Sequence, residues 1–254
     1  MRPYILAETN WKHLKNEKIE LAVLPWGATE AHNYHLPYAT DNIESDHLAA
    51  ESAKLAWDKG AKVIVLPTIP FGVNTGQSDI YLDINLNPST QLAILRDIIT
   101  VLNRQGIHKL LIFNSHGGND FKTMLRELGL EFPDMFLASS NWFQAMDRAA
   151  YFDLDGDHAE EMETSLLLYL RPDLVLPKKD WGAGREKKPK IDSFRESWLW
   201  TERKWSKVTE DTGIGDPKLA TLEKGKKFFE DVTTKIAKVM VQICQMDSNN
   251  NYED

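Results

Sequence analysis

The sequence predicts an α/β protein: a single three-layer α/β/α domain built on a mostly parallel sheet. Short apolar runs alternate along the chain with longer segments whose apolar residues recur at helical spacing. Parallel strands need crossover connections, and helices of this length between successive strands supply them. With 254 residues, 42% of them hydrophobic, the chain can bury one large core.

The first half of the chain predicts two strands and two helices. The run "IELAVLP" (19–25) is short and apolar, as a buried strand is, and "AKVIVLP" (61–67) is a second run of the same kind. Between them, the amphipathic segment 42–60 ends at Gly60, a common helix terminator. The segment 88–106 opens with Pro88, closes with Gly106 and carries apolar residues at helical spacing, so it predicts the second helix.

The second half repeats the alternation and then departs from it. Strands are predicted at 108–114 and 134–142, and helices at 120–131, 160–170 and 216–244. The region 171–215 is polar, rich in Trp, Lys and Gly, and only weakly periodic. It is predicted to be a long excursion from one domain spanning 1–245, and the polar tail 246–254 is predicted to be disordered.

Composition narrows the possible partners and the compartment. A net charge of −8 argues against nucleic acid, whose binding depends on a basic surface. No apolar run approaches the ~18 residues of a membrane span, and the first residues lack the apolar core of a signal peptide. Cys244 is the only cysteine and is predicted to be a buried apolar residue. A cytoplasmic protein is expected, without a nucleic-acid or membrane partner.

Potential metal ligands follow three of the predicted strands. In chain order they are Glu30, His32, His35 and Asp41, then His116, then Asp157, His158 and Glu163. A histidine or glutamate after a strand is usually an ordinary loop residue. Here three separate segments end at the carboxyl edge of one parallel sheet, where ligands of such sheets bind. A metal site is therefore predicted at this edge.

The mixture of ligands indicates which metals would bind. So many carboxylates in one crevice would repel one another and raise their own pKa values, and a pair of divalent cations removes that conflict. Mixed histidine and carboxylate ligation suits Zn²⁺, Mn²⁺ or Fe²⁺ better than Ca²⁺ or Mg²⁺. A carboxylate such as Asp41 can bridge two metals ~3.5–4 Å apart, an arrangement that activates water.

Four stretches resemble blocks of the creatininase family, the creatinine amidohydrolases and their relatives. They are "LPWGATEAHNYHLPYATD" (24–41), "FNSHGGND" (113–120), "DHAEEMETS" (157–165) and "GIGDPKLATLEKG" (213–225). They occur in the family order and span most of the chain. The resemblance implies a creatininase-like fold and a metal-dependent amidohydrolase.

The resemblance also implies roles for individual residues. Two metal sites are implied: Glu30, Asp41 and His116 for one, and His32, Asp41 and Glu163 for the other. Gly118 stands where creatininase itself has a glutamate ligand, and in relatives with two glycines here the glutamate matching Glu163 takes its place. His158 resembles the active-site histidine beside the substrate and the bridging water, so the implied catalytic residues are His158 and Glu163.

Other positions are expected around the metals or the substrate. They are His35, Asn74, Gly117, Trp142 and Asp157. Many relatives carry an H-x-x-F-P-G-T segment that the stretch 71–90 lacks, and Gly117 replaces a tyrosine of creatininase, so creatinine is not the expected substrate. The resemblance implies a homo-oligomer, a hexamer in creatininase, in which the Trp-rich segment 181–205 could cover a neighbour's active site.

Together these observations predict an amidohydrolase with two divalent metals that cleaves a C–N bond, other than a peptide bond, in a small cyclic or formylated amide. The attacking group would be a metal-bridging water, with His158 carrying the proton to the leaving nitrogen. Two alternatives stay open. One is a metal-dependent peptidase of the same family, and the other is a non-catalytic relative that binds a small molecule.

Overall fold

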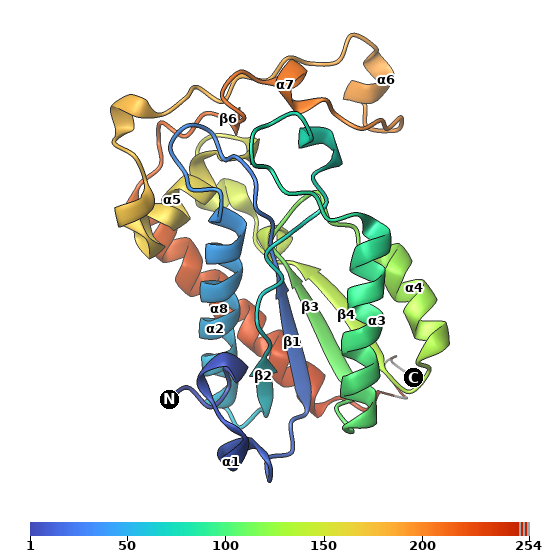
Figure 1. Cartoon of the computed structure of the whole chain (residues 1–254). Helices are drawn as coiled ribbons and strands as arrows, with labels where there is room; N and C mark the ends of the chain where they lie inside the picture. The colour runs from blue at the N-terminus through green and yellow to red at the C-terminus, as the bar shows by residue number, and fades with distance from the viewer. Residues whose placement is uncertain (249, 251, 253–254) are drawn as a thin grey trace.

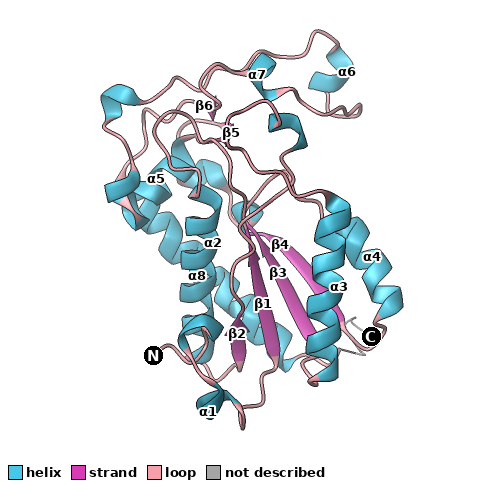
Figure 2. Ribbon diagram, viewed as in Figure 1, coloured by secondary structure: helices cyan, strands magenta, loops and turns pink. Residues whose placement is uncertain are grey.

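A parallel four-stranded sheet forms the centre of the molecule. The computed structural model describes residues 1–248, 250 and 252. The strand order is β2 (Val63–Val65), β1 (Leu21–Trp26), β3 (Lys109–Asn114) and β4 (Phe136–Asn141). In the register of the sheet, Val23 lies opposite Val65 on one side and Leu111 on the other, and Leu111 lies opposite Ala138. The predicted α/β class with a mostly parallel sheet is confirmed (Figures 1 and 2).

Helices cover both faces of this sheet. One face carries α2 (Thr40–Trp57), α5 (Glu161–Leu170) and α8 (Leu222–Gln245), and the other carries α3 (Pro88–Arg104) and α4 (Lys122–Glu131) (Figure 1). The short helix α1 (Trp11–Leu14) precedes β1. This is the three-layer arrangement that the alternation of strands and helices predicted.

The sequence of β1 explains why both faces must be covered. All six of its residues are buried, as in a central strand of a parallel sheet. Because successive side chains point to opposite faces, Leu21 and Val23 join one core and Ala22, Leu24 and Trp26 the other. The first core includes Leu48 of α2 and Phe228 of α8, and the second includes Leu95 of α3 and Leu128 of α4.

The excursion 171–215 lies over the carboxyl end of the sheet (Figure 1). It contains the short helices α6 (Asp192–Arg195) and α7 (Trp205–Val208) and ends in β6 (Ile214–Gly215). Strand β6 pairs antiparallel with β5 (Gly156–His158), a contact between segments about sixty residues apart. The sequence did not predict β5, β6 or α1.

The start of the last helix and the tail after it differ from what the sequence predicted. The last helix begins at Leu222 rather than near 216, because Thr221 caps it by accepting a hydrogen bond from the backbone of Lys224 at 3.2 Å. In the tail predicted to be disordered, residues 249, 251, 253 and 254 lie outside the described residues, while the carbonyl of Met246 accepts a hydrogen bond from Lys109 Nζ at 2.8 Å. Within the described residues, no helix is long and apolar enough to span a membrane.

Candidate metal centre

The loop after β1 returns to the start of α2 and brings three acidic and imidazole side chains together. The backbone N–H of Glu30 donates to the carbonyl of Tyr38 at 3.1 Å, which closes the loop, and Asp41 lies in the first turn of α2. Gly27 allows this approach, because a Cβ there would lie 2.2 Å from Asn42 Oδ1. As a result Glu30, His32 and Asp41 are all buried.

Three imidazoles are oriented in the same way, each by a backbone carbonyl. His32 Nδ1 bonds the carbonyl of Glu30 at 3.0 Å, His116 Nε2 that of Val73 at 3.0 Å, and His158 Nε2 that of Ala31 at 2.8 Å. A carbonyl can only accept, so these nitrogens carry the protons. In the neutral rings, His32 Nε2 and the Nδ1 atoms of His116 and His158 then keep free lone pairs. This is how metal-binding histidines are held in proteins.

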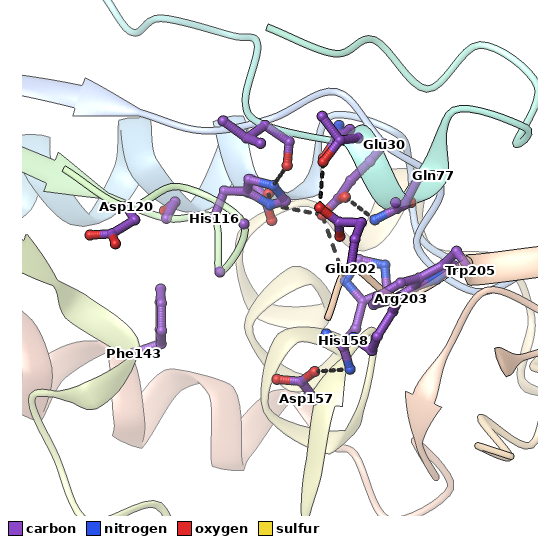
Figure 3. A pocket seen from close by; sticks show the side chains of 18 of the residues that line it. Glu30, Gln77, His116, Asp120, Phe143, Asp157, His158, Glu202, Arg203 and Trp205 are labelled. Carbon is purple, nitrogen blue, oxygen red and sulfur yellow. Dashed lines mark hydrogen bonds and ion pairs between the residues drawn. The ribbon is translucent and has the colours of Figure 1, made fainter. Parts of the chain in front are cut away.

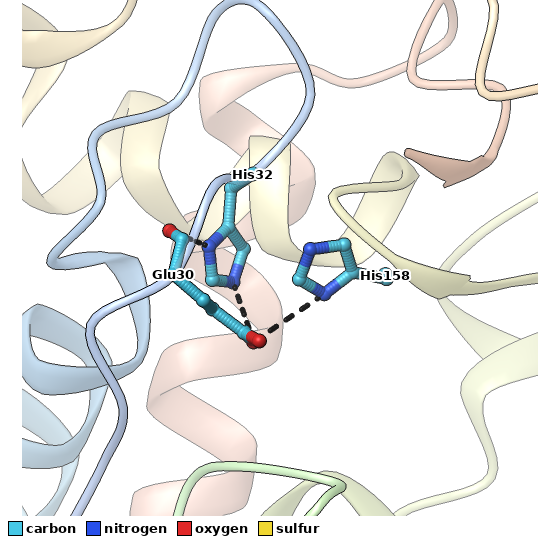
Figure 4. Close-up of side chains that lie close together, drawn as sticks. All are labelled: Glu30, His32 and His158. Carbon is cyan, nitrogen blue, oxygen red and sulfur yellow. Dashed lines mark hydrogen bonds and ion pairs between the residues drawn. The ribbon is translucent and has the colours of Figure 1, made fainter. Parts of the chain in front are cut away.

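The free nitrogens face carboxylates. His32 Nε2 lies 3.1 Å from Asp41 Oδ1, and His116 Nδ1 lies 3.1 Å from Asp41 Oδ2 and 3.0 Å from Glu30 Oε1. His158 Nδ1 is 3.7 Å from Glu30 Oε1, and its ring centre is 4.2 Å from that of His32 (Figures 3 and 4). Each pair places an imidazole lone pair and a carboxylate oxygen where one cation could contact both.

Three groups of ligand atoms are compact enough to hold a metal ion. They are Glu30, Asp41 and His116; His32, Asp41 and Glu163; and Glu30, His32 and His158, with the ligand atoms of each group within 4.8 Å of one another. The structure thus brings together the five predicted ligands in the two predicted sets, and Asp41 belongs to both. His158 lies beside both sets rather than completing either of them.

A tight turn between β5 and α5 places His158 and Glu163 on the same side. Ala159 adopts a left-handed backbone conformation, with φ +52°, although it is buried and is not glycine. Its N–H donates to Glu163 Oε2. The turn therefore aims the last residue of β5 and a residue of the first turn of α5 at the same cluster.

In the metal-free cluster, burial and the close approach of charged groups shift the pKa values of the imidazoles and carboxylates. Burial would lower the pKa of His32, but Asp41 outweighs it and raises that pKa to about 10. Burial raises the pKa of Glu163 to about 8, against the pull of His32. Burial acts against ionisation of Asp41 too, yet His32 and His116 hold its pKa below the usual range. The cluster thus keeps its charges balanced with protons, which divalent cations can replace.

Glu44, one turn after Asp41 in α2, is an acidic residue that the sequence did not single out. It is fully buried, and neither carboxylate oxygen has a hydrogen-bond partner within the described part of the chain. Burial, then the nearby charges of Glu163 and Asp41, raise its pKa well above the ordinary value. Burial and the neighbouring carboxylates thus disfavour a further negative charge on Glu44.

Two residues expected near the substrate or the metals lie behind the cluster. His35 is buried, with Nε2 2.9 Å from Thr164 Oγ1 and its ring stacked on Trp181 at 4.8 Å. Trp142 does not line the cavity: it is buried in the core against Phe228, and its indole N–H donates to Ser115 Oγ at 2.5 Å. Trp142 thus contacts Ser115, a residue of the cavity wall, and its expected role around the metals or the substrate stays a prediction.

A cavity of about 400 Å³ opens over the cluster. Of the other expected residues, Asn74, Gly117 and Asp157 line it. It is also lined by residues that the sequence did not indicate: Gln77, Asp120, Phe143, Arg148 and Glu160. Trp200, Glu202, Arg203 and Trp205 line it too; they belong to the Trp-rich segment that was expected to cover a neighbour's active site and here cover this chain's own cavity. The excursion has no periodic pattern, so no local signal in the sequence could place its residues over the site.

Known proteins show the same architecture over the whole chain. A putatively assigned creatinine amidohydrolase from Bacteroides fragilis is 40% identical, with a TM-score of 0.92 and complete coverage of both chains. A creatininase structure is 23% identical, with a TM-score of 0.77, over 96% of this chain and 99% of that one, which shows a shared fold.

Sequence comparison agrees with the structural likeness. A mycofactocin precursor peptide peptidase from Mycobacterium tuberculosis is 26% identical over 238 residues, 87% of this chain and 86% of that protein. The sequence model of the family described as "Creatininase: Creatinine amidohydrolase" matches residues 7–240. Since that match spans most of the chain, the protein belongs to the creatininase family.

Proposed function

We propose that this protein is an amidohydrolase with two divalent metals that cleaves a C–N bond of a small cyclic or formylated amide. The observation that carries the proposal is the common orientation of His32, His116 and His158. Each imidazole gives one N–H to a backbone carbonyl and turns its other nitrogen toward a carboxylate. Such an arrangement suits metal binding, because it fixes the tautomer and leaves one nitrogen of each ring for the metal.

The residues present fit a pair of transition-metal ions. Glu30, Asp41 and His116 would hold one ion, and His32, Asp41 and Glu163 the other. Creatininase structures of about 22% identity are described as a Zn–Zn form and as an Mn form, which supports Zn²⁺ or Mn²⁺ here. When bound, such ions acidify a water and polarise a carbonyl, the two requirements of amide hydrolysis.

His158 is the group best placed to move a proton. Its Nε2 is fixed on the carbonyl of Ala31, so Nδ1 alone is free to accept a proton and return it to a leaving nitrogen. Burial and the neighbouring His32 lower its pKa, which keeps the ring neutral at pH 7 and ready to accept. The ring of Trp205 packs edge-on against it, with 5.4 Å between the ring centres, and limits its movement.

A peptidase is the second candidate. The likeness to the mycofactocin precursor peptide peptidase extends over 87% of the chain and favours it. The same ligands and the same histidine would serve peptide hydrolysis. The two functions differ in the substrate that the cavity admits, so a panel of substrates separates them.

The test is hydrolysis by the Zn²⁺- or Mn²⁺-loaded protein of a panel of cyclic amides, formamides and short peptides. His158→Ala should retain the metals and lose turnover by ~10²-fold or more, the usual contribution of general acid–base catalysis. His47→Ala is the matched control, since His47 is exposed on α2 and should leave turnover unchanged.

The results of this test separate the amidohydrolase from the peptidase and test the role of His158. Cleavage of peptides but not of cyclic amides or formamides would favour the peptidase. No hydrolysis with both metals bound would overturn the proposed function, and unchanged turnover in His158→Ala would remove His158 from it.

A further inference from the structure

Residues 200–203 of the excursion, here called the strap, cross the mouth of the cavity. The strap rests on Gly76, where a Cβ would lie 2.3 Å from the carbonyl oxygen of Arg203 and 2.7 Å from Glu202 Oε1. Thr75 Oγ1 donates to Glu202 Oε2 at 2.6 Å. Figure 3 shows the side chains of Glu202 and Arg203 entering the cavity from this segment. The strap therefore carries a carboxylate and a guanidinium to the substrate side of the metal cluster.

The two cationic side chains of the cavity wall already have acidic partners. Arg148 lies 2.6 Å from a carboxylate oxygen of the buried Glu160. Arg203 lies 2.8 Å from Asp157 Oδ2, and its guanidinium covers the ring of Trp205 at 4.5 Å. The two arginines therefore offset the charges of Glu160 and Asp157.

Two acids of the wall have no such partner. Apart from the metal ligands and the two paired acids, the cavity is lined by Asp120 and Glu202. Among the described residues, neither has a cationic side chain within ion-pair distance; Asp120 accepts only the backbone N–H of Lys122, at 3.1 Å. The wall thus carries two carboxylates that no cationic side chain of the described residues neutralises.

The neutral side chains of the wall contribute aromatic surface rather than accessible hydrogen-bond acceptors. Asn74 and Gln77 use their amide N–H groups within the protein, on the carbonyls of Thr29 and Ile84 and on Glu30. Their carbonyl oxygens have no donor within the described part of the chain, but both atoms are buried and out of reach of a substrate in the cavity. Phe143 and Trp200 add aromatic surface to the same wall. Aromatic faces beside the carboxylates of Asp120 and Glu202 suit a cationic group of a substrate.

We infer that Glu202 selects amide substrates that carry a positive charge, by pairing with an ammonium or guanidinium group of the substrate. The inference rests on the proposed function for the identity of the reactive bond, but the charge preference itself is a property of binding. Glu202 would act on specificity and not on bond cleavage, because it does not belong to either ligand set.

The test compares three amides that differ in charge: β-alaninamide, which is cationic, butyramide, its neutral isostere, and succinamate, which is anionic. Dissociation constants for the metal-loaded protein are measured by ligand-observed NMR, which also reveals hydrolysis in the same samples. β-Alaninamide should bind about fivefold more tightly than butyramide, the upper range for a partly exposed ion pair, and succinamate more weakly than either. High salt should reduce the preference.

Three variants separate the charge of Glu202 from its other contacts. Glu202→Gln should abolish the preference and its salt dependence. Glu210→Gln removes the same charge from the same excursion at a residue that does not line the cavity, so it should preserve the preference. Thr75→Val removes the hydrogen bond to Glu202 but keeps the carboxylate, and it should still favour β-alaninamide.

Several results would overturn the inference. They are equal binding of the three amides, binding of none of them, a preference for succinamate, or a preference that Glu202→Gln leaves intact. Loss of the preference in Thr75→Val as well as in Glu202→Gln would reduce Glu202 to an anchor of the strap. A charge preference without hydrolysis of any amide would support the inference and overturn the proposed function. Hydrolysis without a charge preference would support the proposed function and overturn the inference.

Discussion

The imidazole of His32 illustrates how a residue of the cluster must lose a proton before it can bind a metal. In the metal-free fold its pKa is about 10, well above the ~6.5 of a free histidine. This bound proton stabilises the metal-free fold fully below pH ~6.5, and the stabilisation is lost as the pH rises through 10. A metal on Nε2 needs the neutral ring, so metal affinity should change with pH in the opposite sense and rise toward pH 10.

Metal binding at pH 7 should therefore release at least two protons per chain, one from His32 and one from Glu163, whose pKa is about 8. His116 should add to this number, because Glu30 and Asp41 outweigh its burial and raise its pKa as well. Calorimetric titration with Zn²⁺ in buffers of different ionisation enthalpy measures this number. The exposed-site variant His47→Ala should release the same number. Release of no protons would show that the cluster is not occupied in the way described.

At the scale of elements, the site depends on the first turns of two helices. Asp41 lies in the first turn of α2 and Glu163 in the first turn of α5, where acidic side chains also favour the helix dipole. The left-handed residue Ala159 lets α5 begin directly after His158. Left-handed backbone costs a non-glycine residue ~1–2 kcal/mol, which glycine avoids.

This conformation predicts an asymmetry between two buried alanines. Ala159→Gly should change the free energy of unfolding by less than about 1 kcal/mol, because relief of the backbone offsets the lost methyl group. Ala53→Gly, within α2, has no such relief and should cost about 2 kcal/mol. Urea denaturation of the metal-free variants measures both. An equal loss at the two positions would contradict the role given to the Ala159 turn.

At the scale of the whole molecule, the sequence predicted what local patterns determine. The four parallel strands and the five main helices follow from apolar periodicity and from terminators such as Gly60 and Gly106. His158 lies on β5, which pairs antiparallel with β6 and was not predicted. The candidate ligands Glu30 and His116 could be predicted, because they stand just beyond the ends of β1 and β3. The topology of a parallel sheet brings such ends together.

Contacts between distant, aperiodic segments could not be predicted. The pairing of β5 with β6, the seat of the strap on Gly76 and the ion pair between Asp157 and Arg203 all join segments that carry no periodic pattern. The backbone carbonyls of Ala31 and Val73 orient two of the imidazoles. Because every residue has a backbone carbonyl, the sequence does not indicate which one accepts such a hydrogen bond. The candidate ligands were therefore predictable from residue types, whereas of the cavity wall only Asn74, Gly117 and Asp157 were expected.

The central claim is that this fold holds two metal ions that share Asp41. The most direct measurement is the transition-metal content of the purified, untagged protein by elemental mass spectrometry, before and after incubation with Zn²⁺ or Mn²⁺. The wild type should carry about two ions per chain, and Asp41→Asn less than one. Asp46→Asn, the same change at an exposed residue of α2, should retain about two. Less than one ion in the loaded wild type, or two in Asp41→Asn, would contradict the claim.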